Sequence, residues 1–388
     1  MNLFEIKMPE DRLHSSFKQI VNDQKAALVR DVIQSWAVGL LDRRGEQKKF
    51  VNEFQTTFNS AFWELYLNKA FSELGFSVDY TKASPDFCVT TPGGYQFNVE
   101  AVISDRSHDT SPPPAAQSEA EWKSQNTLKL AGKIRDKRDI FTGSKGNKFP
   151  YSTLEHVQGR PFVVAVAPFN SDDSLMQNNE IINRVLFGID SPGQKTLLTG
   201  EQKKILSVSK PSGAPVELGV FTNDSYKEVS AVLFSTTGTF GKAVVESGIK
   251  KIVRSTRYRE MSRETFFFTE GANSLGVSHH LVGPSNYLIT TRFEYCGRII
   301  GADVQIYESC LHHETHLDGL HIYYNPFATV PLDLKIVHAD EITHNFYDVK
   351  NGAPDHKHPD GALVSRQVYE PETGVFEYLV RQLTFYGY

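Results

Sequence analysis

The strongest constraint on the fold is a change in hydrophobic period between residues 54 and 104. Apolar residues recur every three or four positions over 54–74, which predicts one amphipathic helix ending before Gly75. Shorter extended segments follow and predict strands at 76–82, 86–91 and 95–104, separated by Ser84-Pro85 and by the turn signal Pro92-Gly93-Gly94. A helix followed by three strands indicates a mixed α/β chain.

The segment 95–104 has the clearest strand pattern in the chain. Alternate residues form an apolar face, made of Phe97, Val99, Ala101 and Ile103. The opposite face carries Glu100 and Val102, which therefore point to the same side. A glutamate inside so apolar a strand needs a partner or solvent. A polar site is therefore expected on the Glu100 side.

The remaining segments suggest three regions along the chain. Residues 1–50 read as a helical extension, and 51–168 as a core completed by a basic helix at 121–141 and a strand buried on both faces at 161–167. Residues 169–388 are mixed α/β, with a role that the sequence does not reveal. Their expected elements are a helix at 179–187 and strands at 216–221, 229–234, 287–294, 304–307 and 321–324. The strand 229–234 is expected to extend the central sheet.

Three acidic residues fall on successive elements of the core: Glu64 in the first helix, Asp86 after Pro85, and Glu100 in the clearest strand. Each acidic residue, taken alone, has a simpler structural interpretation. Glu64 fits a solvated helix position, and an aspartate after proline often caps a turn. Their order on consecutive elements favours one functional cluster.

This order and these residues resemble the PD-(D/E)XK nuclease superfamily, over roughly residues 54–168. The resemblance implies a restriction-endonuclease-like αβββαβ core with a mixed sheet. Glu64 corresponds to the family's acidic helix residue, Asp86 to its PD aspartate and Glu100 to its second acid. More narrowly, Phe62-Trp63-Glu64-Leu65-Tyr66-Leu67, Pro85-Asp86-Phe87 and Val99-Glu100-Ala101 resemble an uncharacterised bacterial branch with Glu-Ala-Val in place of Glu-x-Lys.

The resemblance implies a nuclease that hydrolyses phosphodiester bonds with Mg²⁺ or Mn²⁺, acting on DNA in preference to RNA, in defence or DNA processing. Asp86, Glu100 and the backbone carbonyl of Ala101 would bind the metal, and Glu64 would assist. Carboxylates suit Mg²⁺ because it prefers hard oxygen ligands. A metal ion can both activate a water and stabilise the charge that develops on the phosphate. A homodimer would allow both strands to be cut.

The family's lysine is missing, since Val102 stands in its place. A lysine elsewhere could substitute: Lys82 ends the first predicted strand, and Lys129 and Lys133 lie four apart on the basic helix. Gln96 or Asn98 could instead orient the water, or the site could have lost catalysis. Lys133 is the favoured substitute here.

The charge of one segment supports a nucleic-acid partner, but the charge of the whole chain does not. The whole chain has a formal charge of −5, which argues against a general polyanion-binding protein. The segment 123–148 contains eight basic residues and two acids. Such a segment beside the carboxylates would attract a phosphate backbone, although a solvated helix face is the plainer reading. The expected contacts are Lys129, Lys133, Lys137 and Arg138.

Composition places further bounds. No apolar run is long enough to span a bilayer, the first residues lack a secretory signal, and three scattered cysteines provide no disulfide framework. A cytoplasmic protein without membrane contact is expected. The loop 236–242 is rich in Gly, Thr and Lys, but it lacks P-loop spacing and has Ala243 where Ser or Thr would bind Mg²⁺.

Histidines concentrate between residues 312 and 321, beside Glu314 and Asp318. His312 and His316 are four apart, but the segment lacks the H-E-x-x-H motif and cysteine pairs. A histidine-rich surface loop is therefore the favoured interpretation. Three hypotheses follow: a metal-dependent nuclease, an inactive nuclease-fold module that binds nucleic acid or protein, and a metallohydrolase built on these histidines.

Overall fold

The computed structural model describes residues 1–43, 45–104, 116, 118–144, 146, 149–169, 179–190, 202–260, 276–283, 286–295, 298–337 and 339–385. The basic positions 145 and 148 lie outside these ranges. Eight α-helices are described: α1 (Ser15–Asn22), α2 (Ala27–Trp36), α3 (Gln47–Thr56), α4 (Phe58–Glu73), α5 (Glu119–Thr142), α6 (Asn179–Phe187), α8 (Phe240–Glu246) and α10 (Val375–Phe385). No described helix combines the length and apolar character needed to cross a membrane.

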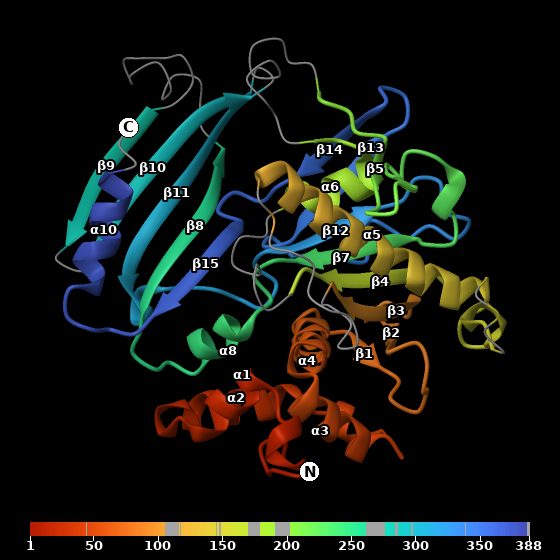
Figure 1. The fold of residues 1–388 in the computed structure, drawn as a ribbon, viewed down its shortest axis with the longest axis horizontal. Helices are drawn as coiled ribbons and strands as arrows, with labels where there is room; N and C mark the ends of the chain where they lie inside the picture. Colours follow the sequence, from red (N-terminus) through yellow and green to blue (C-terminus); the bar gives the residue numbers. More distant parts are fainter. Residues whose placement is uncertain are drawn as a thin grey trace.

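An eight-stranded mixed sheet organises the molecule (Figure 1). Its strands, in spatial order, are β1 (Ser77–Val78), β2 (Phe87–Thr90), β3 (Gln96–Ile103), β4 (Phe162–Ala167), β7 (Ala231–Ser235), β12 (Leu320–Tyr324), β13 (Thr343–Asp348) and β14 (Ala353–Lys357). β3, β4 and β7 run parallel, whereas β1, β2 and β3 are antiparallel neighbours. The mixed α/β class is thus confirmed, and β7 extends the sheet as predicted.

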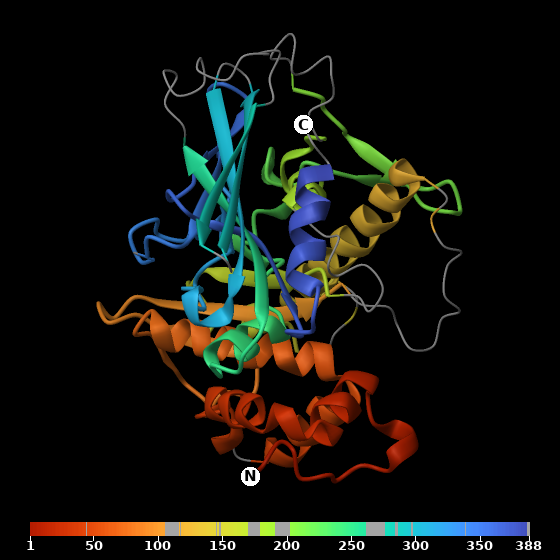
Figure 2. The same ribbon diagram turned by 90° about the vertical axis from the view of Figure 1, so that its left-hand side faces the viewer.

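Helices cover both faces of this sheet. α4 packs against one face through aromatic side chains: Trp63 donates a hydrogen bond to the carbonyl of Ala165 in β4 (3.1 Å), and Tyr66 donates to the carbonyl of His316 (2.7 Å). The other face packs against α5 and α6, whose apolar residues share a core with Val164 and Val232. The N-terminal helices form an outer layer beyond α4 (Figure 2).

A second sheet of five antiparallel strands stands beside the first. Its order is β15 (Leu363–Tyr369), β8 (Ile252–Glu260), β11 (Arg298–Glu308), β10 (Asn286–Tyr295) and β9 (Gly276–Gly283), and α10 packs on it. A short hairpin joins β5 (Ser207–Ser209) to β6 (Pro215–Glu217). The strands expected at 287–294 and 304–307 lie within β10 and β11, whereas only Val216 and Glu217 of the segment expected at 216–221 belong to a strand, β6.

Several predicted boundaries are wrong. The helix expected at 54–74 is two helices, because Thr57 adopts a non-helical conformation between α3 and α4. The strand expected at 76–82 shortens to β1, whose two residues pair with β2. The division after residue 50 falls inside α3, and Leu3, Trp36 and Phe169 share one apolar core with α4 and β3. Residues 1–50 are therefore a layer of the main unit.

Candidate functional site

Strand register places Asp86 opposite Glu100. Phe87 pairs with Val99 in the antiparallel ladder, so the residues just outside that pair also face each other. The amide N–H of Asp86 donates to Glu100 Oε2 (3.3 Å), and the amide of Ala101 donates to Asp86 Oδ2 (2.7 Å). The two acids therefore share one end of β2 and the middle of β3, as expected from their order in the chain.

Glu100 is nearly inaccessible, with 4% of its surface exposed. It points toward α5, where Lys137 donates to Glu100 Oε1 at 2.8 Å. The hydroxyl of Tyr151, in the short helix Tyr151–Thr153, lies 3.5 Å from the same oxygen. Burial and the charge of Asp86 raise the pKa of Glu100 to about 7, against the opposing effect of Lys137. Glu100 therefore has the partner that its buried position requires.

Lys137 is the lysine that α5 brings to the carboxylates. Burial alone would lower its pKa, but the charges of Glu100 and Asp86 outweigh that effect and raise it. Lys133, the favoured substitute from sequence, makes no hydrogen bond or ion pair within the described part of the chain. It lies one helical turn before Lys137. The lysine in contact with Glu100 is therefore Lys137, and a catalytic role for Lys133 stays a prediction.

Glu64 lies on α4, directly after the anchored Trp63, and is half-buried. Burial raises its pKa well above the usual range, and the nearby charge of Asp86 raises it further. Arg43 opposes this effect. Glu64 is thus electrostatically linked to the pair on β2 and β3, although it makes no hydrogen bond to either acid among the described residues.

Arg43 was not anticipated from the sequence. Its guanidinium donates to the carbonyl of Asp86, and it lies over the rings of Phe87 (5.8 Å) and Tyr80 (6.0 Å). It is buried, with 8% of its surface exposed. No local pattern marks Arg43, because it reaches the site from the loop between α2 and α3. It ties the N-terminal layer to the candidate site.

Val102, at the position where the resemblance implies a lysine, packs against the apolar core beneath α5. It lies two positions after Glu100 on the same strand face. Asn98, on the same face before Glu100, donates to the carbonyl of His156 (3.4 Å). Val102 is thus accommodated as a packing residue, while Lys137 supplies the positive charge from α5.

The chemistry of this donor set fits a hard divalent cation. Asp86 and Glu100 offer carboxylate oxygens close enough for the charge of Asp86 to raise the pKa of Glu100. Mg²⁺ commonly uses only one or two protein carboxylates with waters and substrate oxygens. Among the described residues, however, no three His, Cys, Asp or Glu side chains converge as a ready-made metal site. Ala101 enters the observed arrangement through its N–H.

The predicted nucleic-acid contacts along α5 have different surroundings. Arg138 pairs with Glu228 (2.8 Å) and stacks over Tyr226 (4.8 Å), so it is already engaged within the protein. Lys137 is engaged with Glu100. Lys129 and Lys133 are half-exposed on the same helix. The basic segment is therefore partly a set of internal ion pairs.

The segment 312–319 is a loop with an exposed His313, as predicted, but the other histidines of the cluster are not at the surface, so the interpretation is wrong for them. His312, His316 and His321 are all buried. His316 lies between Glu73 (2.6 Å) and Glu246 (3.1 Å), and His312 contacts Glu314 (2.5 Å). These carboxylates come from α4, α8 and the loop after β11, so His312 and His316 belong to ion-pair networks between elements.

The glycine-rich loop 236–242 is structural. Lys242 is buried and pairs with Glu314 (2.7 Å), while its ammonium also donates to the carbonyls of Thr315 and Asp318. Arg366 binds the same Glu314 (3.0 Å). Burial alone would raise the pKa of Glu314, but Arg366 and Lys242 hold it well below its usual range. Lys242 is thus committed to a buried internal ion pair.

Comparisons of this chain with protein families, curated proteins and solved structures find no match.

Proposed function

We propose that the protein is a divalent-metal-dependent nuclease with a PD-(D/E)XK-type centre, in which Lys137 takes the role of the motif lysine. The observation that carries the proposal is the ion pair between Lys137 and Glu100, made beside Asp86. One acid directly before β2, another on the adjacent β3 and a lysine beside them are the components that the resemblance implies. The lysine comes from a helix instead of the strand.

The residues have distinct roles in this proposal. Mg²⁺ or Mn²⁺, when bound by Asp86 and Glu100, would lower the pKa of a coordinated water and offset charge on the phosphate. The Ala101 amide holds the Asp86 carboxylate, and Arg43 holds the adjacent backbone. Glu64, with its raised pKa, would hold a proton or accept one near the phosphate. Lys137 would contact the phosphate or orient the water once Glu100 turns to the metal.

Lys129 and Lys133 extend the positive charge along α5 from Lys137. Positive side chains at successive turns suit a phosphate backbone. DNA is proposed in preference to RNA, and a homodimer is the proposed assembly for cutting two strands. Both proposals come from the family resemblance.

A non-catalytic nucleic-acid- or protein-binding module is the second candidate. Two observations favour it: Lys137 already neutralises Glu100, and the described residues hold no preformed three-ligand metal set. On this reading the acid–lysine pair only stabilises the fold. Binding would then need no metal and would produce no cleavage.

The deciding experiment incubates the protein with supercoiled, linear and single-stranded DNA and with RNA, in Mg²⁺, Mn²⁺ or EDTA. The Asp86→Ala/Glu100→Ala double variant, checked for folding by circular dichroism, is the matched control. Metal-dependent cleavage by the wild type alone supports the nuclease. Equal binding by both proteins without cleavage supports the binding module.

A further inference from the structure

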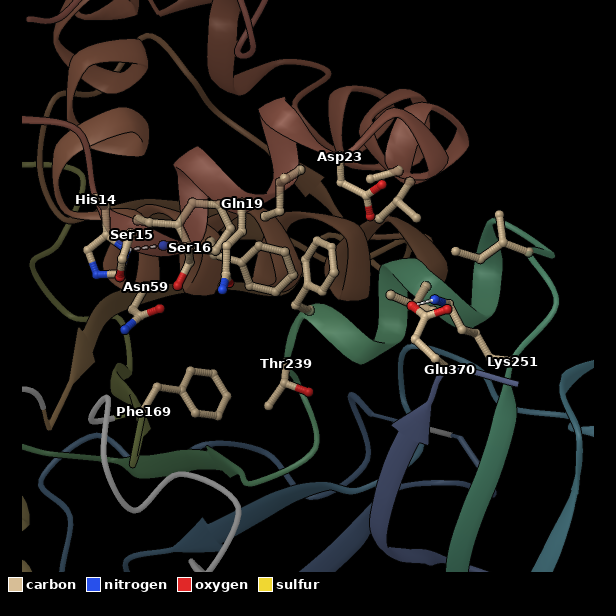
Figure 3. Close-up of a pocket in the computed structure, with 18 residues that line it drawn as sticks. His14, Ser15, Ser16, Gln19, Asp23, Asn59, Phe169, Thr239, Lys251 and Glu370 are labelled. Carbon is tan, nitrogen blue, oxygen red and sulfur yellow. Dashed lines mark hydrogen bonds and ion pairs between the residues drawn. The ribbon is translucent and has the colours of Figure 1, made fainter. Parts of the chain in front are cut away.

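A second site lies away from the carboxylates. A cavity of about 670 Å³ opens between the N-terminal layer and the sheet (Figure 3). Its walls include Phe169, two residues after β4 ends, and Thr239, four residues after β7 ends. β4 and β7 are parallel, so both residues follow strand carboxyl ends at one edge of the sheet. Open α/β sheets commonly bind ligands at that edge, and this volume suits a small molecule.

Aromatic rings form one wall of the cavity. His14, Phe58, Phe62 and Phe240 follow one another in a row, with successive ring centroids 6.0, 5.7 and 6.3 Å apart. Phe240 is half-exposed, whereas Phe58 and Phe62 are buried. Aromatic rows of this kind favour a planar aromatic ligand, through offset or edge-to-face contact.

Polar side chains that make no hydrogen bond to any described residue face the same space. Figure 3 shows Asn59, Gln19 and Ser16 around the cavity, opposite Thr239. Within the described residues, the side chains of Asn59, Gln19 and Ser16 make no hydrogen bond. Amides and hydroxyls provide both donors and acceptors, which match the edge of a heteroaromatic ring.

The charges of the residues that line the cavity argue against a phosphate-bearing ligand. Among the described residues that line the cavity, the single lysine, Lys251, already pairs with Glu370. Asp23 adds a negative charge near the rim, and its side chain accepts a hydrogen bond from the amide of Lys25 (2.8 Å). A phosphate would therefore meet carboxylates and no available ammonium. The lining favours an uncharged compound.

From this combination we infer that the cavity binds an uncharged heteroaromatic small molecule of nucleobase or nucleoside size. Its ring would lie against Phe240, and Asn59 would hydrogen-bond its polar edge. This cavity is separate from the carboxylate site, since none of Asp86, Glu100 or Lys137 lines it. Binding needs neither the metal nor the cleavage proposed above.

The test measures binding of adenosine, guanosine, cytidine and uridine, each beside its 5′-monophosphate, by calorimetry and saturation-transfer NMR in EDTA. We expect saturable binding of at least one nucleoside. Its monophosphate should bind roughly tenfold more weakly, because like charges across a site oppose binding. The absence of saturable binding by any nucleoside would overturn the inference, as would tighter binding of the monophosphates.

Two variants locate the binding. Asn59→Leu removes an amide that makes no hydrogen bond within the described part of the chain, and it should weaken nucleoside binding by roughly tenfold. Phe240→Leu keeps apolar bulk but removes the ring, and it should also weaken binding. Asn52→Leu is the matched control, because Asn52 is another half-buried asparagine that lies on α3 and outside the cavity. Unchanged affinity in both cavity variants, with folding verified by circular dichroism, would contradict the assignment.

Discussion

The ammonium of Lys137 lies 2.8 Å from Glu100 Oε1, although the two residues belong to a helix and a strand 37 positions apart. Glu100 lies two positions before Val102 on the same face of β3, and Lys137 places its positive charge beside Glu100. A lysine supplied by α5 can therefore reach the region that a strand lysine would occupy. This relationship makes the role of Lys137 directly testable.

Replacing Lys137 with methionine should reduce the rate of metal-dependent cleavage by ~100-fold or more, because the site loses the α5 ammonium that contacts Glu100. Lys133→Met is the matched control, one helical turn away and without contact to the carboxylates among the described residues. It should leave the rate at saturating substrate close to that of the wild type. Single-turnover assays measure both. Equal losses in the two variants would contradict a specific role for Lys137.

Moving the lysine back to the strand should restore part of the activity. Val102→Lys in the Lys137→Met background returns an ammonium to the Glu100 face, near the position that Lys137 served. Cleavage should therefore exceed that of Lys137→Met alone. Val102→Met in the same background controls for side-chain length. If Val102→Lys in the Lys137→Met background is no more active than Val102→Met in that background, the position of the positive charge is not what limits cleavage.

The buried Arg366–Glu314 pair should make Gly241 indispensable. A Cβ at Gly241 would collide with the Arg366 guanidinium, which Glu314 and the carbonyl of Thr237 hold in place. Gly241→Ala should therefore destabilise the fold by about 3 kcal/mol, the typical loss when a buried ion pair is broken. Gly132→Ala, inside α5 with no atom within 4 Å of the added Cβ, should stabilise it by about 0.5–1 kcal/mol. Urea unfolding distinguishes the two, and similar midpoints would refute the prediction.

The sequence predicted those parts of the site that depend on local order and strand register. Asp86 and Glu100 face each other because a tight turn fixes how β2 pairs with β3, and the turn residues are visible in the chain. The choice of Lys137 over Lys133 depends on how α5 is rotated against the sheet. Packing of Leu130 and Ile134 against distant strands sets that rotation. No local sequence pattern indicates how α5 is rotated against the sheet.

The histidines illustrate the same limit. His316 looked like a loop residue because its neighbours in sequence are polar. Its partners, Glu73 and Glu246, lie 243 and 70 positions away and meet it only after α4 and α8 have packed. The indole of Trp36 donates to the same Glu246 (2.7 Å), so residues of α2, α4 and α8 meet around His316. Contacts between residues so far apart in the chain leave no periodic pattern in the sequence.

His316 should make the stability of the fold fall as pH rises from 6.5 through its raised pKa. Burial alone would lower its pKa, but Glu246 and Glu73 outweigh burial and raise it above 6.5. A raised histidine pKa stabilises the fold fully below pH 6.5, and the contribution is lost as pH rises through the native value. His316→Gln should therefore cost about 1.5–3 kcal/mol at pH 6, the range for hydrogen bonds to charged groups, and less at pH 9. Urea unfolding across this pH range measures the difference, with exposed His313→Gln as the matched control. A cost that stays constant with pH would show that the His316 charge does not stabilise the fold.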